Sequence, residues 1–370
     1  MGVFTMLRCS KCILPSNYVG INFDEHSVCN FCRDWKEIKY KGGEALRAAI
    51  LSAKKRKTNP SNKYDCLLGV SGGRDSSYLL YYLTNVLDLR VLAFSADNGL
   101  IPDQTIKNIE RMVDKLGVDL LMTRHDYLKK CFRSHFSAWI HRPTVGMAGV
   151  LCTGCRIGIE KMKLDIAKEY NIPVVISGGT PLEGGGYKSN IIKVNPAGGR
   201  FSFVAGYLSE LMLNPHWIIN PDCMTIQGLE YYYNYLKGGK RDFIEISPFW
   251  QYLRWSEQEI IPTIERELGW SKNPKLESTW RGDCDVGVVK MYLYRSILGF
   301  DDKDDHLSSL IRDNQITRQD AMRRIEREGG LNEEFVEEII KDNGFRLTDL
   351  NAAIEKSKAR YNRKSRTQST

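Results

Sequence analysis

The feature that most constrains the fold is the stretch CLLGVSGGRDSSYLL at residues 66–80. Residues 66–70 form a short apolar run of the length of a buried parallel strand. Gly72 and Gly73 follow, and glycine allows backbone angles and a close approach to a ligand that a Cβ would block. From Asp75 the chain reads as a helix, whose free N–H groups face whatever the loop surrounds. This order predicts a phosphate site. The alternative is an ordinary helix cap after a tight turn.

Strand-like and helix-like runs alternate along the chain around this loop. This alternation predicts an α/β fold with a doubly wound parallel sheet and right-handed crossovers. Beyond residue 286 the chain reads as helices, with Thr317 and Thr348 as expected N-caps. Strands are predicted at residues 65–70, 90–96, 118–123, 173–178 and 242–246, and helices at 76–87, 103–116, 156–170 and 256–268.

The pattern S-G-G-x-D-S-S resembles the PP-loop of the ATP pyrophosphatase superfamily. Neither GxxxxGK[ST] nor GxGxxG after a strand occurs in the chain. The resemblance implies an enzyme that splits ATP between its α and β phosphates, with Mg²⁺ as counter-charge to the departing pyrophosphate. The loop residues implied to bind ATP and pyrophosphate are Ser71, Gly72, Gly73, Arg74 at the variable position, Asp75, Ser76 and Ser77.

Two further predicted strands end in polar and glycine residues, and ligands gather at the carboxyl ends of parallel strands. We expect Asp97, after the second strand, and Gly178 and Thr180, after the fourth, to contact the nucleotide. The alternative at residues 97–99 is an ordinary Asn-Gly turn. A mobile lid is expected to follow Tyr187. The tyrosines at 231, 232, 233 and 235 are more typical of helix packing than of stacking on a base.

Four cysteines near the N-terminus have the spacing of a zinc ribbon. Cys9 and Cys12 form one C-x2-C pair, and Cys29 and Cys32 form a second pair after sixteen intervening residues. Two such pairs offer four thiolates to one tetrahedral ion, which leaves no open position for chemistry. We therefore expect a structural Zn²⁺ site. The alternative is four unrelated thiols.

A second cysteine set is less complete. Cys152 and Cys155 form a C-x2-C pair at the start of a predicted helix, whose dipole lowers the pKa of a thiol. The segment CTGCR, followed by a helix and the strand IPVVISGG, resembles that of the iron–sulfur tRNA thiolases in the same superfamily. Those enzymes have a third cysteine later in the chain, and Cys284 in ESTWRGDCD occupies a comparable place. Three thiolates hold a [4Fe–4S] cluster or a zinc ion, or bind no metal, and these alternatives stay open.

Size and charge favour a cytoplasmic enzyme. The chain has 370 residues and a formal net charge of +8, of which residues 355–370 supply five through six Lys or Arg against one acid. We expect these residues to form a flexible basic tail, and the small remaining charge does not favour a nucleic-acid partner. No run of about 18 apolar residues and no signal-peptide pattern occurs, so no membrane segment is expected. The expected parts are a zinc ribbon (1–40), a nucleotide domain (60–285), a C-terminal helical region (286–354) and the tail.

The ribbon, the PP-loop, the central C-x2-C pair and ESTWRGDCD together resemble the N-acetyl sugar amidotransferases of the WbpG/PseA type, which act in surface-polysaccharide biosynthesis. The likeness runs from CSKCILPS through VSGGRDSSY to GDCDVG. It implies that an acetamido group on a nucleotide-linked or nine-carbon sugar is converted to an acetamidino group, for example in building lipopolysaccharide or O-antigen.

The implied chemistry is coherent. An amide needs activation before its oxygen can be replaced, so the amide oxygen would attack the α-phosphate of ATP and ammonia would then displace AMP. The candidate catalytic residues are Asp75, Ser76, Asp283 and Asp285, and Glu183 is a further candidate base. No glutaminase segment is recognisable, so the resemblance implies a separate glutaminase and a cyclase-like subunit that channel ammonia.

Two other functions remain as alternatives. ATP-dependent tRNA thiolation shares the adenylation step and the three-cysteine site, but no RNA-binding domain or second ribbon is recognisable after Cys284. A zinc-ribbon RNA-binding module with a degenerate loop is disfavoured by the intact PP-loop motif.

Overall fold

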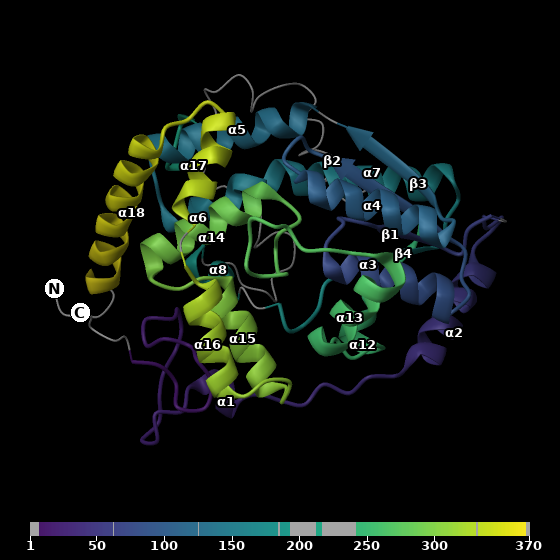
Figure 1. The fold of residues 1–370 in the computed structure, drawn as a ribbon, viewed down its shortest axis with the longest axis horizontal. Coiled ribbons are helices and arrows are strands. Elements are labelled where there is room, and N and C mark those ends of the chain that lie inside the picture. Colours follow the sequence, from purple (N-terminus) through teal and green to yellow (C-terminus); the bar gives the residue numbers. More distant parts are fainter. Residues whose placement is uncertain are drawn as a thin grey trace.

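A computed structural model describes residues 7–367 except 62, 125, 184–185, 193–211, 217–241 and 331. Its centre is a five-stranded sheet in the order β3-β2-β1-β4-β5, in which every neighbouring pair is parallel (Figure 1). The strands are β1 (Cys66–Gly69), β2 (Val91–Asp97), β3 (Asp119–Arg124), β4 (Val174–Ile176) and β5 (Ile244–Ile246). The predicted doubly wound α/β sheet and all five predicted strands are confirmed.

Helices cover both faces of the sheet (Figure 1). Successive residues of a strand point to opposite faces. Leu68 and Ile176 therefore pack in the core beneath α2, α3, α4 and α13, whereas Leu67 and Val175 pack against α7 on the other side. These helices are α2 (Gly43–Arg56), α3 (Arg74–Tyr81, continued by a π-helical turn at Tyr82–Val86), α4 (Asp103–Leu116), α7 (Thr153–Glu169) and α13 (Glu257–Leu268).

A second core lies beside the sheet and joins the two ends of the chain. It packs the N-terminal cysteine region, through Leu14 and Tyr18, with Phe136 of α5, Val289 of α14 and Ile339 of α17. The predicted helical character beyond residue 286 is confirmed. The remaining described elements are α1 (Asn30–Arg33), α5 (Asp126–His141), α6 (Val145–Ala148), a 3-10 turn (Gly149–Cys152), α8 (Gly186–Ile191), α12 (Pro248–Gln251), α14 (Asp285–Leu298), α15 (Asp302–Arg312), α16 (Arg318–Glu328), α17 (Glu333–Asp342) and α18 (Leu347–Thr367).

The C-terminal end differs from the expectation. α18 continues to Thr367, so the segment predicted as a flexible basic tail is helical over most of its length. The buried Ile354 and Ser357 and the partly buried Tyr361 lie on one side of this helix, and the Arg360 guanidinium donates a hydrogen bond to Pro143 O at 2.9 Å. A charge count cannot reveal this packing stripe, because basic side chains occupy the positions between its members.

One of the two predicted N-caps is confirmed. Thr317 caps α16, and its hydroxyl accepts a hydrogen bond from Asp320 N at 3.1 Å. Thr348 is not the cap of the last helix, because α18 begins at Leu347. The tyrosine cluster at residues 231–235 and most of the expected lid lie outside the described residues. No described helix contains a stretch long and apolar enough to cross a membrane.

Candidate functional site

The loop after β1, which we call the PP-loop after the sequence pattern that it resembles, folds back on the start of α3. The Ser76 and Ser77 hydroxyls both donate to Gly73 O, at 3.2 and 2.8 Å, and the Gly73 N–H donates to Ser71 Oγ at 3.3 Å. These short-range bonds close the turn and place the first N–H groups of α3 at the carboxyl end of β1. The predicted strand, glycine turn and helix are therefore present, in the geometry that suits an anion.

Space and backbone angle both require glycine at Gly72, and the space for a side chain at Gly73 is tight. Gly72 has a φ of +75°, and a Cβ there would lie 2.6 Å from the backbone oxygen of Thr105. A Cβ at Gly73 would lie 3.0 Å from Asp283 Oδ2. The Trp270 indole N–H also donates to Gly72 O at 3.0 Å. The loop is thus enclosed on both sides, and the candidate catalytic Asp283 lies against it.

Arg74 is buried and connects the loop to distant parts of the chain. Its guanidinium donates to Glu257 Oε1 at 2.5 Å and to Thr279 Oγ1 at 3.0 Å, and its Nη2 lies 3.3 Å from His306 Nε2. Burial lowers the pKa of His306 to about 3, with the Arg74 charge acting in the same direction. A neutral imidazole can accept the hydrogen bond that Arg74 donates.

Three carboxyl groups gather around the loop. Asp75 accepts a hydrogen bond from the Trp255 indole at 2.9 Å, and burial raises the pKa of its carboxyl. Burial also raises the pKa of Glu183, and Asp75 and Asp283 act in the same direction. One or two carboxylates together with phosphate oxygens are the usual ligands of Mg²⁺. The residues present therefore fit a Mg²⁺ ion that is bound together with a nucleotide.

The other predicted site residues lie at the carboxyl ends of β2 and β4, which flank β1. Asp97 Oδ1 accepts a hydrogen bond from Gly99 N at 2.7 Å, and its other oxygen is 3.8 Å from Arg124 Nε. Thr180 Oγ1 accepts from Leu182 N at 3.3 Å. Gly178 follows the end of β4, and a Cβ there would approach only one side-chain carbon, at 3.9 Å. Whether these residues contact a nucleotide stays a prediction.

Asp285 has different neighbours from Asp283. It is the first residue of α14, and its N–H donates to Leu100 O at 3.0 Å. Burial raises the pKa of its carboxyl to about 6, with Glu338 adding to the shift and Lys275 opposing it. The charged groups near Asp283 are instead those around the PP-loop. A role for Asp285 in catalysis stays a prediction.

The four ribbon cysteines form a tight, buried group. Their sulfurs all lie within 4.8 Å of one another, with 3.7 Å between Cys12 and Cys29 and 4.0 Å between Cys9 and Cys32. Four sulfurs at about 2.3 Å from a tetrahedral zinc ion would lie about 3.8 Å apart. The hydrogen bond with the Cys29 thiol holds the pKa of Cys12 far below its usual range. The donor set fits one zinc ion.

Cys155 and Cys284 of the second cysteine set lie beside Asn98. Its amide nitrogen lies 3.4 Å from Cys155 Sγ and 3.7 Å from Cys284 Sγ. The Lys290 ammonium donates a hydrogen bond to Cys152 Sγ at 3.1 Å. Burial alone would raise the pKa of this thiol, but the charges of Lys290 and other cations bring the pKa below the ordinary value. These three sulfurs do not reach the 4.8 Å spacing of the ribbon group. The three predicted cysteines lie near one another, but their sulfurs are farther apart than those of the four ribbon cysteines.

Sequence reasoning missed α15, the helix DKDDHLSSLIR. Eight of its polar or charged side chains are buried, and they connect three parts of the molecule. His306 contacts Arg74 of the PP-loop, Asp302 binds Lys188, and Asp305 accepts a 2.6 Å hydrogen bond from Tyr18 of the ribbon. A run of four acids and a histidine next to an apolar helix was the available signal. By itself it is typical of an exposed surface.

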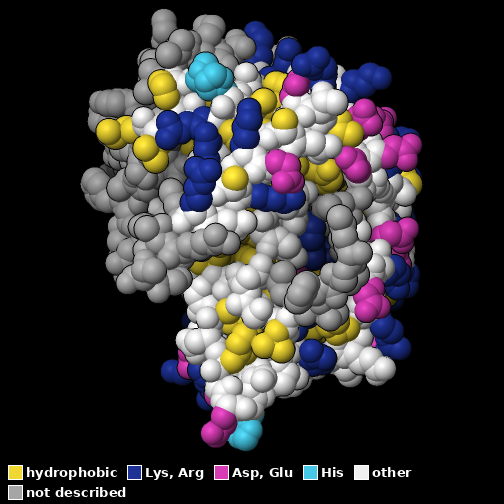
Figure 2. Space-filling view, turned by 90° about the vertical axis from the view of Figure 1, so that its left-hand side faces the viewer, with side chains coloured by type: hydrophobic (Ala, Val, Ile, Leu, Met, Phe, Trp, Pro, Cys, Tyr) yellow, Lys and Arg dark blue, Asp and Glu magenta, His cyan; other side chains and the backbone are white. Residues whose placement is uncertain are grey.

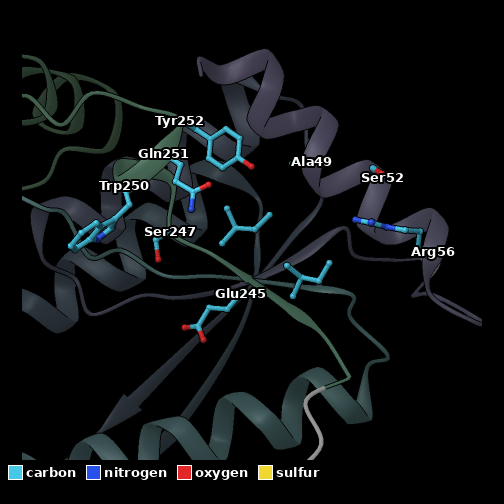
Figure 3. A pocket seen from close by; sticks show the side chains of 10 residues that line it. Ala49, Ser52, Arg56, Glu245, Ser247, Trp250, Gln251 and Tyr252 are labelled. Carbon is cyan, nitrogen blue, oxygen red and sulfur yellow. The ribbon is translucent and has the colours of Figure 1, made fainter. Parts of the chain in front are cut away.

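A cavity of about 460 Å³ lies elsewhere, between α2 and the β5–α12 segment. Figure 3 shows Ser52 and Arg56 of α2 on one side and Trp250, Gln251 and Tyr252 on the other. None of the predicted site residues lines it. The candidate site therefore remains at the PP-loop and the adjoining cysteines.

Residues 287–368 match the family model described as LPS biosynthesis protein WbpG-like, C-terminal domain. The C-terminal region of this chain is thus similar to that domain, and we call residues 287–368 the WbpG-like domain. The family resemblance read from the motifs is confirmed in this region, which comprises nearly all of α14 and then α15 to α18. Through Arg74 and His306 the WbpG-like domain is in direct contact with the PP-loop.

Other relatives match shorter segments. The chain is 27% identical over 123 residues to an uncharacterized protein of Methanocaldococcus jannaschii, which covers 33% of this chain and 44% of that protein. It is 29% identical over 101 residues to a glutamine-hydrolyzing GMP synthase of Chlamydia caviae, which covers 27% of this chain and 18% of the synthase. The chain thus spans less than half the length of these curated relatives.

Two solved structures are also similar. NMN synthetase from Francisella tularensis has a TM-score of 0.28 and 15% identity, covering 38% of this chain and 56% of that chain. The U34-tRNA thiolase NcsA from Methanococcus maripaludis, with its [4Fe–4S] cluster, has a TM-score of 0.33 and 17% identity, covering 87% of this chain and 88% of that chain.

Proposed function

We propose that this protein is an ATP-dependent amidotransferase of lipopolysaccharide or related glycan biosynthesis, which converts an acetamido group of a sugar, free or nucleotide-linked, to an acetamidino group. The observation that carries the proposal is the contact between Arg74 and His306, at 3.3 Å. It connects the loop that suits pyrophosphate with the WbpG-like domain. The two regions then serve one reaction.

The proposed reaction has two steps and balances. The amide oxygen attacks the α-phosphorus of ATP, the bond from that phosphorus to the bridging oxygen breaks, and pyrophosphate leaves. Ammonia adds to the activated carbon, and the carbon–oxygen bond breaks so that AMP leaves with the former amide oxygen. Acetamide, ATP and ammonia become amidine, AMP and pyrophosphate, and a base takes the proton that ammonia loses.

The chain's own residues have distinct tasks in this scheme. The N–H groups at the start of α3 and the hydroxyls of Ser71 and Ser76 would bind the pyrophosphate. Mg²⁺ held with Asp75 would supply charge neutralisation for the phosphates. Glu183 and Asp283 are the carboxyl groups near the loop that could take the proton from ammonia, and the raised pKa of Glu183 suits such a base.

Ammonia would come from a separate glutaminase through a cyclase-like subunit. Free ammonia should replace both subunits in a purified system at high concentration. Localisation in the cytoplasm would follow from the supply of ATP and activated sugars.

A second candidate is tRNA thiolation, which is favoured by the arrangement of Cys155 and Cys284 around Asn98. Three convergent cysteines could hold a [4Fe–4S] cluster with one iron open to a sulfur donor. The WbpG-like domain supports the amidotransferase instead.

One experiment separates the two. Purified protein is incubated with ATP, ammonium chloride and either acetamido sugars or bulk tRNA, and pyrophosphate, AMP and product mass are measured. The sugars tested should include UDP-linked and CMP-linked N-acetyl sugars. Release of pyrophosphate and AMP with a sugar, together with the mass change for replacing O by NH, supports the proposal. Release stimulated by tRNA alone would reject it in favour of thiolation, and amidine made from glutamine without partners would reject the separate glutaminase.

A further inference from the structure

Three cations lie close to one another, one of them near the carboxyl groups at the PP-loop, and none has a part in the proposed adenylation. Lys188 is on α8, Arg281 precedes the candidate base Asp283 by two residues, and Lys290 is on α14. The positive charges of Lys290 and Arg281 lower the pKa of Lys188. The charge of Arg281 also acts to lower the pKa of Glu183. We refer to Lys188, Arg281 and Lys290 as the cationic cluster.

Among the described residues, Asp302 is the one carboxylate within 4.0 Å of the cationic cluster. The Lys188 ammonium pairs with the buried Asp302 carboxylate, and Arg281 Nε lies 3.6 Å from the same carboxylate. Asp302 also accepts a hydrogen bond from the Tyr187 hydroxyl at 2.7 Å. Within the described residues no carboxylate lies within 4.0 Å of Lys290, whose recorded contact is Cys152 Sγ. Asp302 therefore serves two of the cations at close range, while Glu183 and Asp283 act on Arg281 from beyond 4.0 Å. The third cation contacts the Cys152 thiol.

Burial and cation crowding act together on Lys188. Burial lowers the pKa of its ammonium to about 8, and Lys290 and Arg281 act in the same direction while Asp302 opposes them. An additional anion would relieve this crowding, because an opposite charge within about 6 Å favours the protonated amine.

The backbone of Arg281 is also unusual. Its φ is +53°, in the left-handed region that costs a non-glycine residue free energy and that is concentrated at functional sites. The guanidinium carbon lies 5.0 Å from the ring centre of Trp280, so the planar group is held against an aromatic ring. Arg281 Nε is buried and makes no hydrogen bond within the described residues. An arginine oriented in this way presents a fork of N–H groups that matches a carboxylate or a phosphate.

We propose that Lys188, Arg281 and Lys290 bind an anionic group of the acetamido sugar, a carboxylate or a phosphate, and so orient its amide toward the PP-loop. This inference rests on the proposed function. Arg281 is near Glu183 and Asp283, and Asp283 lies against Gly73. A sugar held by its acidic group in the cationic cluster can therefore present its amide oxygen to ATP in the loop.

The test measures binding alone, on the full chain saturated with a non-hydrolysable α,β-methylene analogue of ATP. Three probes are titrated by calorimetry: neutral N-acetylglucosamine, N-acetylneuraminic acid with its carboxylate, and UDP-N-acetylglucosamine with its diphosphate. We expect at least one acidic probe to bind at least about 10-fold more tightly than the neutral sugar. The probe that binds identifies a carboxylate or a phosphate as the recognised group.

Variants test whether binding of the acidic probe depends on the cationic cluster. Arg281→Gln should weaken binding of the acidic probe about 10-fold or more, and Arg281→Lys should weaken its binding less. Asp302 keeps Lys188 as its partner in both. A double variant Lys188→Gln, Asp302→Asn removes the ammonium and its carboxylate partner together and should weaken binding, while Glu183 and Asp283 remain as carboxyl groups near Arg281. The partly exposed Lys272, changed to Gln, is the matched control and should bind as wild type.

Two results would overturn the inference: acidic probes that bind no better than N-acetylglucosamine, or acidic probes that bind Arg281→Gln and the double variant as tightly as wild type. Failure of the proposed function has a different signature. In that case the acidic sugar and the ATP analogue both bind, but no amidine forms with ATP and ammonium.

Discussion

Arg74 Nη2 and His306 Nε2 lie 3.3 Å apart although 232 residues separate them in the chain. His306 Nδ1 lies 2.8 Å from Leu182 O, and a carbonyl oxygen only accepts, so Nδ1 carries the proton and Nε2 accepts from the guanidinium. The imidazole is stacked on Trp280, with ring centres 4.9 Å apart. One neutral ring thus fixes the PP-loop arginine, the segment after β4 and the WbpG-like domain relative to one another.

This contact predicts a pH dependence of stability. Because burial lowers the pKa of His306 to about 3 in the folded state, below the ordinary 6.5, the unfolded chain binds more protons between these values. The contribution of His306 should be complete above pH 6.5 and decline as the pH falls toward 3, by up to about 1.4 kcal/mol per pH unit.

His306→Gln isolates this effect, because Gln keeps an acceptor for Arg74 but does not titrate. Urea unfolding of both proteins between pH 7.5 and 4.5 would measure it. Wild type should lose more stability than the variant on acidification, and parallel losses would contradict the prediction.

Gly72→Ala should disrupt the loop. The new Cβ would lie 2.6 Å from Thr105 O at a φ of +75°, where neither the backbone nor the helix α4 can yield easily. We expect the free energy of unfolding to fall by about 2–4 kcal/mol. ATP-dependent pyrophosphate release should be lost as well. Gly330→Ala is the matched control, since its Cβ would meet nothing within 4 Å. Full pyrophosphate release by the Gly72 variant would contradict an enclosed glycine turn.

The zinc content of the protein should depend on the ribbon cysteines and not on the second cysteine set. We expect one zinc per chain by elemental analysis, lost on Cys29→Ser and retained on Cys152→Ser. The Cys29 variant should also melt at lower temperature, because Tyr18 and Ile13 of the ribbon make hydrogen bonds to Asp305 and Ser308 of α15. Iron measured in the same samples would report on the second cysteine set. Zinc retained by Cys29→Ser would rule out a four-thiolate site.

Asp285→Asn should stabilise the protein at neutral pH. Burial raises the pKa of Asp285 to about 6 from 3.8, so the folded state holds this proton more tightly and stability falls as the pH rises through that window. The variant removes the cost of a buried charge. We expect a gain of about 1–3 kcal/mol at pH 7.5 and little gain at pH 4.

The same denaturation experiment provides the check. Lys341→Gln, on an exposed position of α17, serves as a control that changes one charge at the surface. A loss of stability in Asp285→Asn at pH 7.5 would contradict the prediction.

Much of the candidate site could be predicted because its signals are local. The strand, the two glycines and the helix start at residues 66–80 are adjacent in the chain, and each residue's backbone preference is expressed within the same few residues. The two C-x2-C pairs of the ribbon are likewise recognised by their spacing, and all four cysteines meet in one group. By contrast, Thr348 and the basic C-terminal residues were assigned from composition and capping preference, which do not report what a helix packs against.

The sequence by itself determined the elements that depend on neighbouring residues: the parallel strands, the glycine loop and the paired thiols. Tertiary structure alone decided the partners of buried charges. α15 contains Asp302, Asp305 and His306, which in isolation are typical of an exposed helix, yet each has a partner from a different part of the chain. A charged side chain can be buried only where a residue from another part of the chain supplies an opposite charge or a hydrogen bond. The packing of the whole chain decides whether such a residue lies there.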